Sequence, residues 1–246
     1  MNLPNLFLWI TVSAISLSAN AQLEKLEIIY ERKFYWTKMY DKLDFLSEEE
    51  KTKQKLVWGK RDGRSENYNL KITPTASLYT YGENESENTY SWKQDEFLLI
   101  HELQDNKLIQ QRVVGGKLLV IEDESPQVKW KIHNEIRQVA DYLCMKAVTQ
   151  DTIKDQEITA WFTTEIPIST GPEGLSGLPG LILMVEINDG TMVLEATKIK
   201  ALEGEIERPE KIKGKKLDLE DYNAIVEKYF KESVERKRNP FWGMRY

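Results

Sequence analysis

The sequence predicts a mainly β protein, an antiparallel meander that forms a strongly curved open sheet or partial barrel. Short runs in which apolar and polar residues alternate recur along the chain, and this period of two is typical of strands. Two-residue turn signals such as Gly115-Gly116 separate several runs and indicate hairpins between antiparallel neighbours. One amphipathic helix near the C-terminus can cover the apolar face of such a sheet. A two-sheet β-sandwich remains the alternative, because both folds show the same alternation.

The N-terminal segment predicts export. Residues 1–21 carry no charged side chain and hold an apolar run from Leu6 to Leu17, which is too short to span a bilayer. Ala19-Asn20-Ala21 fits a small-x-small cleavage site, so Gln22 is the expected mature N-terminus. We therefore expect a signal peptide at 1–21 and a periplasmic or extracellular mature chain without a transmembrane span.

Composition narrows the classes of function. Residues 22–246 contain no Ser/Gly/Pro-rich linker and no internal repeat, which predicts one β-rich domain. With 34 basic and 40 acidic residues, the net charge is −6 without a dense basic stripe, which argues against a nucleic-acid partner. The single cysteine, Cys144, excludes an intramolecular disulfide and a thiolate zinc cluster. We expect no cofactor.

The mature chain opens with a long alternating run. Residues 24–36 predict a strand, with Arg32 as the exception on its apolar side. Ser47 and Glu50 have the spacing of a capping box and predict a mostly polar surface helix over residues 47–58. Further strands are expected over residues 67–72, 76–81, 97–103, 107–114, 117–122, 127–132 and 136–149, with turns at Asp105-Asn106, Gly115-Gly116, Ser125-Pro126 and His133-Asn134 and an exposed loop over residues 82–88.

The most constrained stretch lies in the C-terminal half. Residues 158–164 predict a strand, and Pro167 should end regular pairing because proline has no N–H to donate. Residues 181–187 are apolar on almost every position and predict a central strand. The turn signal Asn188-Asp189-Gly190 then leads into a hairpin partner over residues 191–199.

A glycine-rich loop joins these strands. Residues 171–180 hold four glycines and two prolines together with Leu175 and Leu178, which predicts a stiff turn and not a flexible linker. Pro179-Gly180 suits a type II turn, in which Gly180 adopts a positive φ. A phosphate-binding loop would lead into a helix, and the Walker type needs a lysine; this loop joins two strands and has none.

The motifs around this loop resemble the GLPGLI family, named for the hexapeptide at residues 177–182. The similarity covers at least residues 130–187. Asp141 departs from it, because such sequences usually carry glycine before the tyrosine. The family comprises secreted or envelope proteins of Bacteroidetes-type bacteria, so the resemblance implies export but no particular activity. We expect a structural turn and a contact surface from the family motif residues Trp161, Glu165, Pro167, Gly171, Pro172, Gly177, Leu178, Pro179, Gly180, Leu181 and Ile182.

The chain ends in a helix and an aromatic tail. Asp218 can cap a helix over residues 218–238, whose apolar positions recur at intervals of three and four and so form one stripe. This stripe should pack on the sheet, and Asn239-Pro240 should end the helix. The last six residues include three aromatic side chains, which is unusual for a C-terminal tail that makes no contacts. We expect them to occupy a groove or contact a partner through Phe241, Trp242 and Tyr246.

Candidate catalytic groups are few. His101-Glu102 lies in a predicted strand, where neighbouring side chains point to opposite faces and do not share one ion. His133-Asn134-Glu135 matches only half of a zinc-deaminase signature. Cys144 is expected to be buried and inert. Glu165 and Glu186 are candidates for a glycosidase-type carboxylate pair, whose separation the sequence does not give. We predict no catalytic or metal-binding residue.

These observations predict a non-catalytic exported module that binds a peptide, a lipid or another envelope protein, such as an outer-membrane protein. The stiff loop at 171–180 and the aromatic tail are sequence types suited to pre-organised recognition. The alternative is a secreted hydrolase or peptidase-like enzyme that uses acidic residues and a histidine. A binding module should show an apolar groove without convergent ionisable groups, whereas an enzyme should pack such groups together in a cleft.

Overall fold

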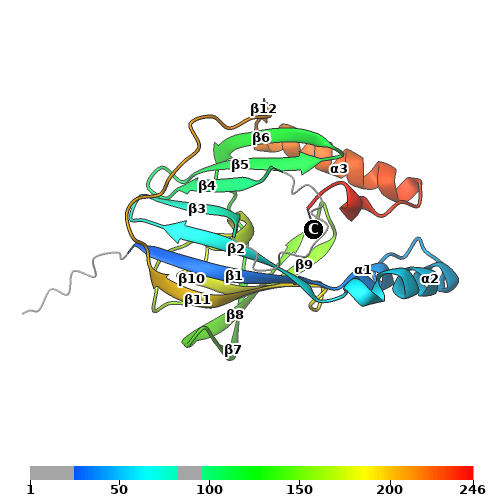
Figure 1. Cartoon of the computed structure of the whole chain (residues 1–246), viewed down its shortest axis with the longest axis horizontal. Coiled ribbons are helices and arrows are strands. Elements are labelled where there is room, and N and C mark those ends of the chain that lie inside the picture. The colour runs from blue at the N-terminus through cyan, green and yellow to red at the C-terminus, as the bar shows by residue number, and fades with distance from the viewer. Residues whose placement is uncertain (1–24, 83–95, 246) are drawn as a thin grey trace, which may run out of the picture.

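The computed structural model describes residues 25–82 and 96–245. Twelve strands of these residues form one sheet, which curls around the C-terminal end of the chain (Figure 1). The strands are β1 (Leu26–Phe34), β2 (Arg64–Ile72), β3 (Ala76–Tyr81), β4 (Leu98–Glu102), β5 (Lys107–Val114), β6 (Lys117–Glu124), β7 (Lys131–Val139), β8 (Tyr142–Asp151), β9 (Gln156–Thr163), β10 (Leu181–Ile187), β11 (Met192–Ala201) and β12 (Lys215–Leu217). The helices are α1 (Trp36–Asp41), α2 (Glu48–Trp58) and α3 (Leu219–Glu235), with short turns η1 (Gly59–Arg61), η2 (Pro172–Gly174) and η3 (Pro240–Trp242).

The sheet consists of two antiparallel meanders that meet at β1 and β11. The strand order is β12-β6-β5-β4-β3-β2-β1-β11-β10-β9-β8-β7. After β6 the chain crosses to the opposite edge of the sheet, enters at β7 and returns strand by strand to β1. Only β12 is parallel to its neighbour, β6. This single open sheet confirms the predicted β fold and excludes the sandwich.

Both predicted helices form at their predicted caps. In α2, the Ser47 side chain accepts from the Glu50 N–H and the Glu50 carboxylate accepts from the Ser47 N–H, which is the full capping box. In α3, Asp218 accepts from the Asp221 N–H. The apolar stripe of α3 packs through Val226 on β5 and β6, as expected. No helix of the described residues is long and apolar enough to cross a membrane.

The predicted turn at His133-Asn134 is wrong. Both residues lie inside β7, where a register shift between Ile132 and Ile136 keeps the strand paired with β8. The turn instead falls at Ala140-Asp141, whose φ values are +47° and +70°. A positive φ favours glycine and tolerates aspartate, which accounts for the departure at Asp141 from the usual glycine.

The predicted positive φ at Gly180 is also wrong, since Gly180 is absent from the left-handed region of the backbone. The reason for glycine here is close packing of two chain segments. A Cβ at this position would lie 2.7 Å from the carbonyl carbon of Thr163 and still closer to its oxygen. The motif glycine therefore lets the loop pass directly over the end of β9.

The inner face of the sheet contains the main core. Fully buried tyrosines on neighbouring strands lie on this face, among them Tyr30 of β1, Tyr68 of β2 and Tyr79 of β3. The loop from 164 to 180 folds onto the same face, where the Tyr30 hydroxyl donates to the Ile182 carbonyl oxygen at 2.6 Å. The segment after β11 covers part of the outer face and places Ile206 against the smaller apolar cluster of β3 and β4. Residues 1–21, the loop at 83–88 and Tyr246 lie outside the described residues, so the signal peptide stays a prediction.

Candidate functional site: an arginine cage beside a pocket

The C-terminal segment turns back into the curve of the sheet. Asn239 caps η3 by accepting from the Phe241 N–H, and the chain then runs along the end of β5. The Gly115 N–H donates to the Gly243 carbonyl oxygen at 2.6 Å, and Val114 pairs with Met244 as an isolated bridge. The segment that follows η3, up to Arg245, thus lies within the curve of the sheet (Figure 1). The described part of the aromatic tail occupies a groove, which is one of the two predicted outcomes.

Arg245, near the end of this segment, is held in a cage of aromatic and acidic side chains. Its Nε donates to both carboxylate oxygens of Glu173 at 2.8 Å, and its second guanidinium nitrogen also pairs with Glu173. A further guanidinium N–H donates to the Tyr68 hydroxyl at 3.1 Å. The guanidinium carbon lies 4.0 Å from the ring centre of Phe97 and 5.9 Å from that of Tyr81. We call Glu173, Tyr68, Tyr81 and Phe97 the guanidinium cage.

The buried charge of Glu173 is compensated on two sides. Burial acts to raise the pKa of this carboxyl, but the charge and hydrogen bonds of Arg245, with the charge of Arg112, outweigh burial and hold the pKa at about 2. Arg112 lies 3.6 Å from a Glu173 carboxylate oxygen and also donates to the Glu173 backbone carbonyl oxygen at 3.1 Å. Glu173 is therefore a fixed anion at neutral pH.

Glu173 reaches Arg245 from a strained backbone conformation. The residue lies in η2, at the start of the glycine-rich loop, with φ at +59°. This left-handed conformation is uncommon for a residue with a Cβ and is retained where surrounding contacts fix it. Here the contacts are the ion pairs to Arg245 and Arg112, so the loop predicted as a stiff turn positions the central charge of the interior.

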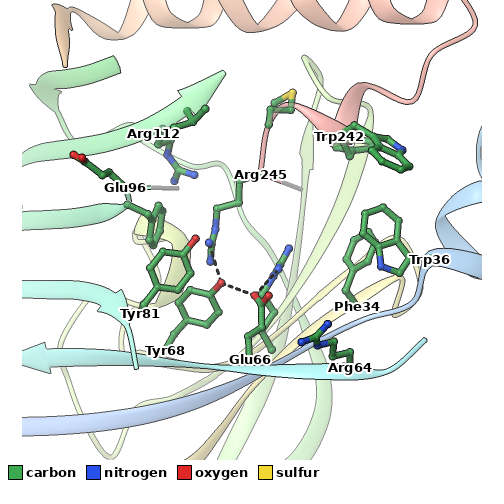
Figure 2. A pocket seen from close by; sticks show the side chains of 15 residues that line it. Phe34, Trp36, Arg64, Glu66, Tyr68, Tyr81, Glu96, Arg112, Trp242 and Arg245 are labelled. Carbon is green, nitrogen blue, oxygen red and sulfur yellow. Dashed lines mark hydrogen bonds and ion pairs between the residues drawn. The ribbon is translucent and has the colours of Figure 1, made fainter. Parts of the chain in front are cut away.

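A pocket of about 280 Å³ opens beside the cage (Figure 2). On its floor, Arg32 pairs with Glu66 at 3.2 Å, and the Tyr68 hydroxyl donates to the same carboxylate at 2.9 Å. Burial acts to raise the pKa of Glu66, but Arg32 and the Tyr68 hydrogen bond lower it overall. Arg64 also lines this pocket, and no carboxylate of the described residues lies within ion-pair distance of it. We call this space the outer pocket.

Aromatic rings form one wall of the outer pocket. Trp36 lies 4.6 Å from Phe34 and 5.1 Å from Trp58, measured between ring centres. Trp242 joins this group 5.0 Å from Trp58 and donates from its indole nitrogen to the Tyr40 hydroxyl. Trp242 is nevertheless 58% exposed, so the wall continues to the molecular surface.

A smaller inner pocket of about 180 Å³ lies behind the tail. Arg112, Val113, Met244 and Arg245 line both pockets, so β5 and the C-terminal segment both lie at the boundary between them. Lys154 and Asp151 enter the inner pocket from the β8–β9 turn. Burial lowers the pKa of Lys154, although the Asp151 carboxylate, 3.5 Å away, acts in the opposite direction.

Ionisable groups do converge in this site, so the expectation of a purely apolar groove is wrong. Their chemistry is nevertheless that of ion pairing, because the lowered pKa values keep Glu66 and Glu173 ionised and unable to donate a proton at neutral pH. Among the described residues, the fifteen that line the outer pocket include no His, Cys, Ser or Thr. In the described residues, no group of three or more His, Cys, Asp and Glu side chains is arranged to hold a metal ion.

The other candidate catalytic groups lie elsewhere. Glu186 pairs with Arg137 at 2.7 Å, and Glu165 accepts from the Leu143 N–H, so each carboxylate has its own partner outside the outer pocket. Cys144 is fully buried, as predicted. Burial, and to a lesser degree the Glu165 charge, raises the pKa of its thiol to about 11.

The family motif residues are mainly structural. Gly177 and Pro179 are exposed, whereas Gly171, Pro172 and Leu178 are buried between the loop and the sheet. Of the remaining motif residues, Glu165 and Pro167 are exposed. The other four are buried, namely Trp161, Gly180, Leu181 and Ile182. The structure thus places little of the motif on the surface, and its connection to the site is through Glu173.

Sequence reasoning missed the centre of the site. Glu173 and Arg245 are separated by 72 positions along the chain, and neither stands in a recognisable pattern. One signal was present, since Arg32 lies on the apolar side of its strand, where a charge requires a buried partner. That partner is Glu66, directly opposite on β2.

Comparison with known proteins supports the fold, and one family model matches a short stretch of the chain without confirming the GLPGLI family name. A family model described as "Protein of unknown function (Porph_ging)" matches residues 149–184, which include Glu173. No curated protein sequence matches the chain. Two solved structures of PNGF-II, in space groups P21 and C2, are similar at TM-scores of 0.55 and 0.54 with 16% and 14% identity. The similarity covers 82% of this chain but only 33% and 32% of the PNGF-II chains, so this chain spans about a third of their length.

Proposed function

We propose that this chain is a non-catalytic exported module that binds a peptide or a segment of another protein in the outer pocket. The observation that supports this most is the joining of an aromatic wall to charged groups at an opening of the sheet. Flat rings give a ligand large contact area at low entropic cost, and among the described residues no carboxylate pairs with the guanidinium of Arg64. The predicted signal peptide and the motif series support export and placement in the GLPGLI family.

A peptide suits the outer pocket better than a lipid. Four arginines and two glutamates of the described residues line it, and an acyl chain would have to bury the Arg64 charge, which has no carboxylate partner among those residues. A peptide carries its own backbone donors and acceptors and can pair with both signs of charge. The hydrolase alternative has no support here, because Arg32 occupies the Glu66 carboxylate, and Arg245 and Arg112 occupy that of Glu173.

Selection from a displayed random peptide library tests this proposal. Peptides enriched on the mature protein should lose at least tenfold in affinity for the double variant Trp36→Ala/Arg64→Ala, because it removes an aromatic wall and the Arg64 guanidinium. Glu195→Ala, an exposed position on β11, is the matched control and should bind like the parent. Equal binding to parent and pocket variant, or no enrichment at all, would exclude the outer pocket as the ligand site.

A further inference from the structure

The cage gives the Arg245 guanidinium three kinds of contact, to a carboxylate, a hydroxyl and aromatic rings. The Glu173 carboxylate accepts its hydrogen bonds on one edge, the Tyr68 hydroxyl accepts on another, and the Phe97 ring lies against its face. Planar hydrogen-bonding geometry and stacking together discriminate a guanidinium from the ammonium of lysine. Both Arg245 and Glu173 are close to nine-tenths buried, with side-chain exposures of 13% and 11%.

The residue that fills this cage comes from the end of the chain. Its segment follows η3 and contacts the backbone of the sheet through the Gly115–Gly243 hydrogen bond and the Val114–Met244 bridge. Neither contact belongs to the ladder that pairs β5 with β6, which is complete from Lys107 to Val114. The segment is thus held by this hydrogen bond, this bridge and the buried side chains of Met244 and Arg245, and its release would leave the strand pairs of the sheet intact.

The outer pocket leads directly to the cage. Tyr68, Tyr81 and Phe97 belong to the cage and also line the outer pocket (Figure 2). A peptide held against the aromatic wall would therefore reach Glu173 if the C-terminal segment moved aside. Met244 and Arg245 of this segment line both pockets together with Arg112 and Val113 of β5, so its movement would remove part of the boundary between them.

We propose, building on the binding role above, that the guanidinium cage is a receptor for an arginine-bearing peptide segment. The chain's own C-terminal segment fills it at rest, and the partner's arginine takes its place on binding. Three observations point to this: the carboxylate, hydroxyl and aromatic contacts of the guanidinium, the attachment of the Arg245 segment outside the β5–β6 ladder, and the strained backbone that holds Glu173 in position. The Arg245 side chain thus occupies the site at which the arginine of the partner would bind.

The test uses the full mature chain with Arg245→Ala, which empties the cage and keeps the rest of the segment. Isothermal titration with acetyl-Gly-Met-Arg-amide should show binding at least tenfold tighter than with the matched Lys and citrulline peptides. The parent protein should bind the Arg peptide at least tenfold more weakly than the variant, because its own arginine competes. Adding Glu173→Gln to the variant should abolish the preference for arginine.

Equal affinity for the Arg and citrulline peptides, or no binding to a folded Arg245→Ala variant, would overturn the cage as a receptor. Where this variant does not fold alone, methylguanidinium should restore its near-UV circular dichroism and methylammonium should not; failure of this rescue also overturns the proposal. The two proposals fail separately. Library peptides that need the outer pocket but no arginine would keep the binding role and exclude the cage, whereas arginine binding without library enrichment would do the reverse.

Discussion

Replacing Glu173 by glutamine keeps the shape of the side chain and removes the charge that compensates Arg245. The pKa of Glu173 is about 2 in the folded chain, against an ordinary value of 4.5. A difference of about 2.5 units corresponds to about 3 kcal/mol of stability at neutral pH. Breaking one side of a buried ion pair typically costs 3–5 kcal/mol, so two independent arguments agree on about 3 kcal/mol.

The depressed pKa of Glu173 also determines how the stability difference between the parent and Glu173→Gln changes with pH. Because the folded pKa of Glu173 is depressed, its contribution is fully present above the unfolded value and is lost as the pH falls from about 5 towards 2. Urea unfolding should therefore show Glu173→Gln less stable than the parent by about 3 kcal/mol at pH 7, with the gap reduced by about half at pH 3. The exposed control Glu195→Gln should stay within about 0.5 kcal/mol of the parent. A Glu173→Gln variant as stable as the parent at pH 7, or a gap independent of pH, would refute the reasoning.

Two further predictions concern the motif and the cysteine. Gly180→Ala should destabilise the protein by at least about 2 kcal/mol, because its Cβ would overlap the Thr163 backbone. In the control Gly59→Ala, the Cβ would meet nothing closer than 3.9 Å, so its stability should stay within about 0.5 kcal/mol of the parent. Thermal melts that coincide for Gly180→Ala and the parent would disprove the overlap. Cys144, buried and with a pKa of about 11, should react with a thiol reagent only as fast as the chain unfolds, and rapid labelling of the native protein would show that the site is open.

Local patterns predicted most of the sheet. Alternation and turn residues placed β3 and β5 at their observed bounds, and the paired glycines at 115–116 do adopt positive φ, as a primed hairpin turn requires. The error in β7 has a physical cause. His133 and Asn134 look like a turn by composition, but the sheet absorbs them in a register shift, while the turn formed at Asp141 with a residue that tolerates a left-handed backbone.

The candidate site could not be predicted in the same way, because it depends on contacts between distant parts of the chain. The aromatic tail was expected to occupy a groove or to meet a partner, but its anchoring residue is the arginine among the aromatics. Nothing near Arg245 in the sequence indicates Glu173, since the two meet only after α3 has turned the chain back across β5. Similarly, the sequence predicted that glycine is required at position 180 but assigned this to a positive φ. The requirement comes from the close approach of Gly180 to the Thr163 backbone, a tertiary contact that local sequence does not reveal.

The central claim is that the outer pocket holds a partner in the cell. A photo-crosslinking amino acid at position 113, which lines the pocket, should capture a defined protein or peptide in cells that produce the chain, and the same amino acid at position 195, on an exposed stretch of β11, should not. Addition of Trp36→Ala should reduce capture from position 113 at least tenfold, because it removes the aromatic wall. Equal capture from positions 113 and 195, or from position 113 with and without Trp36, would contradict the claim.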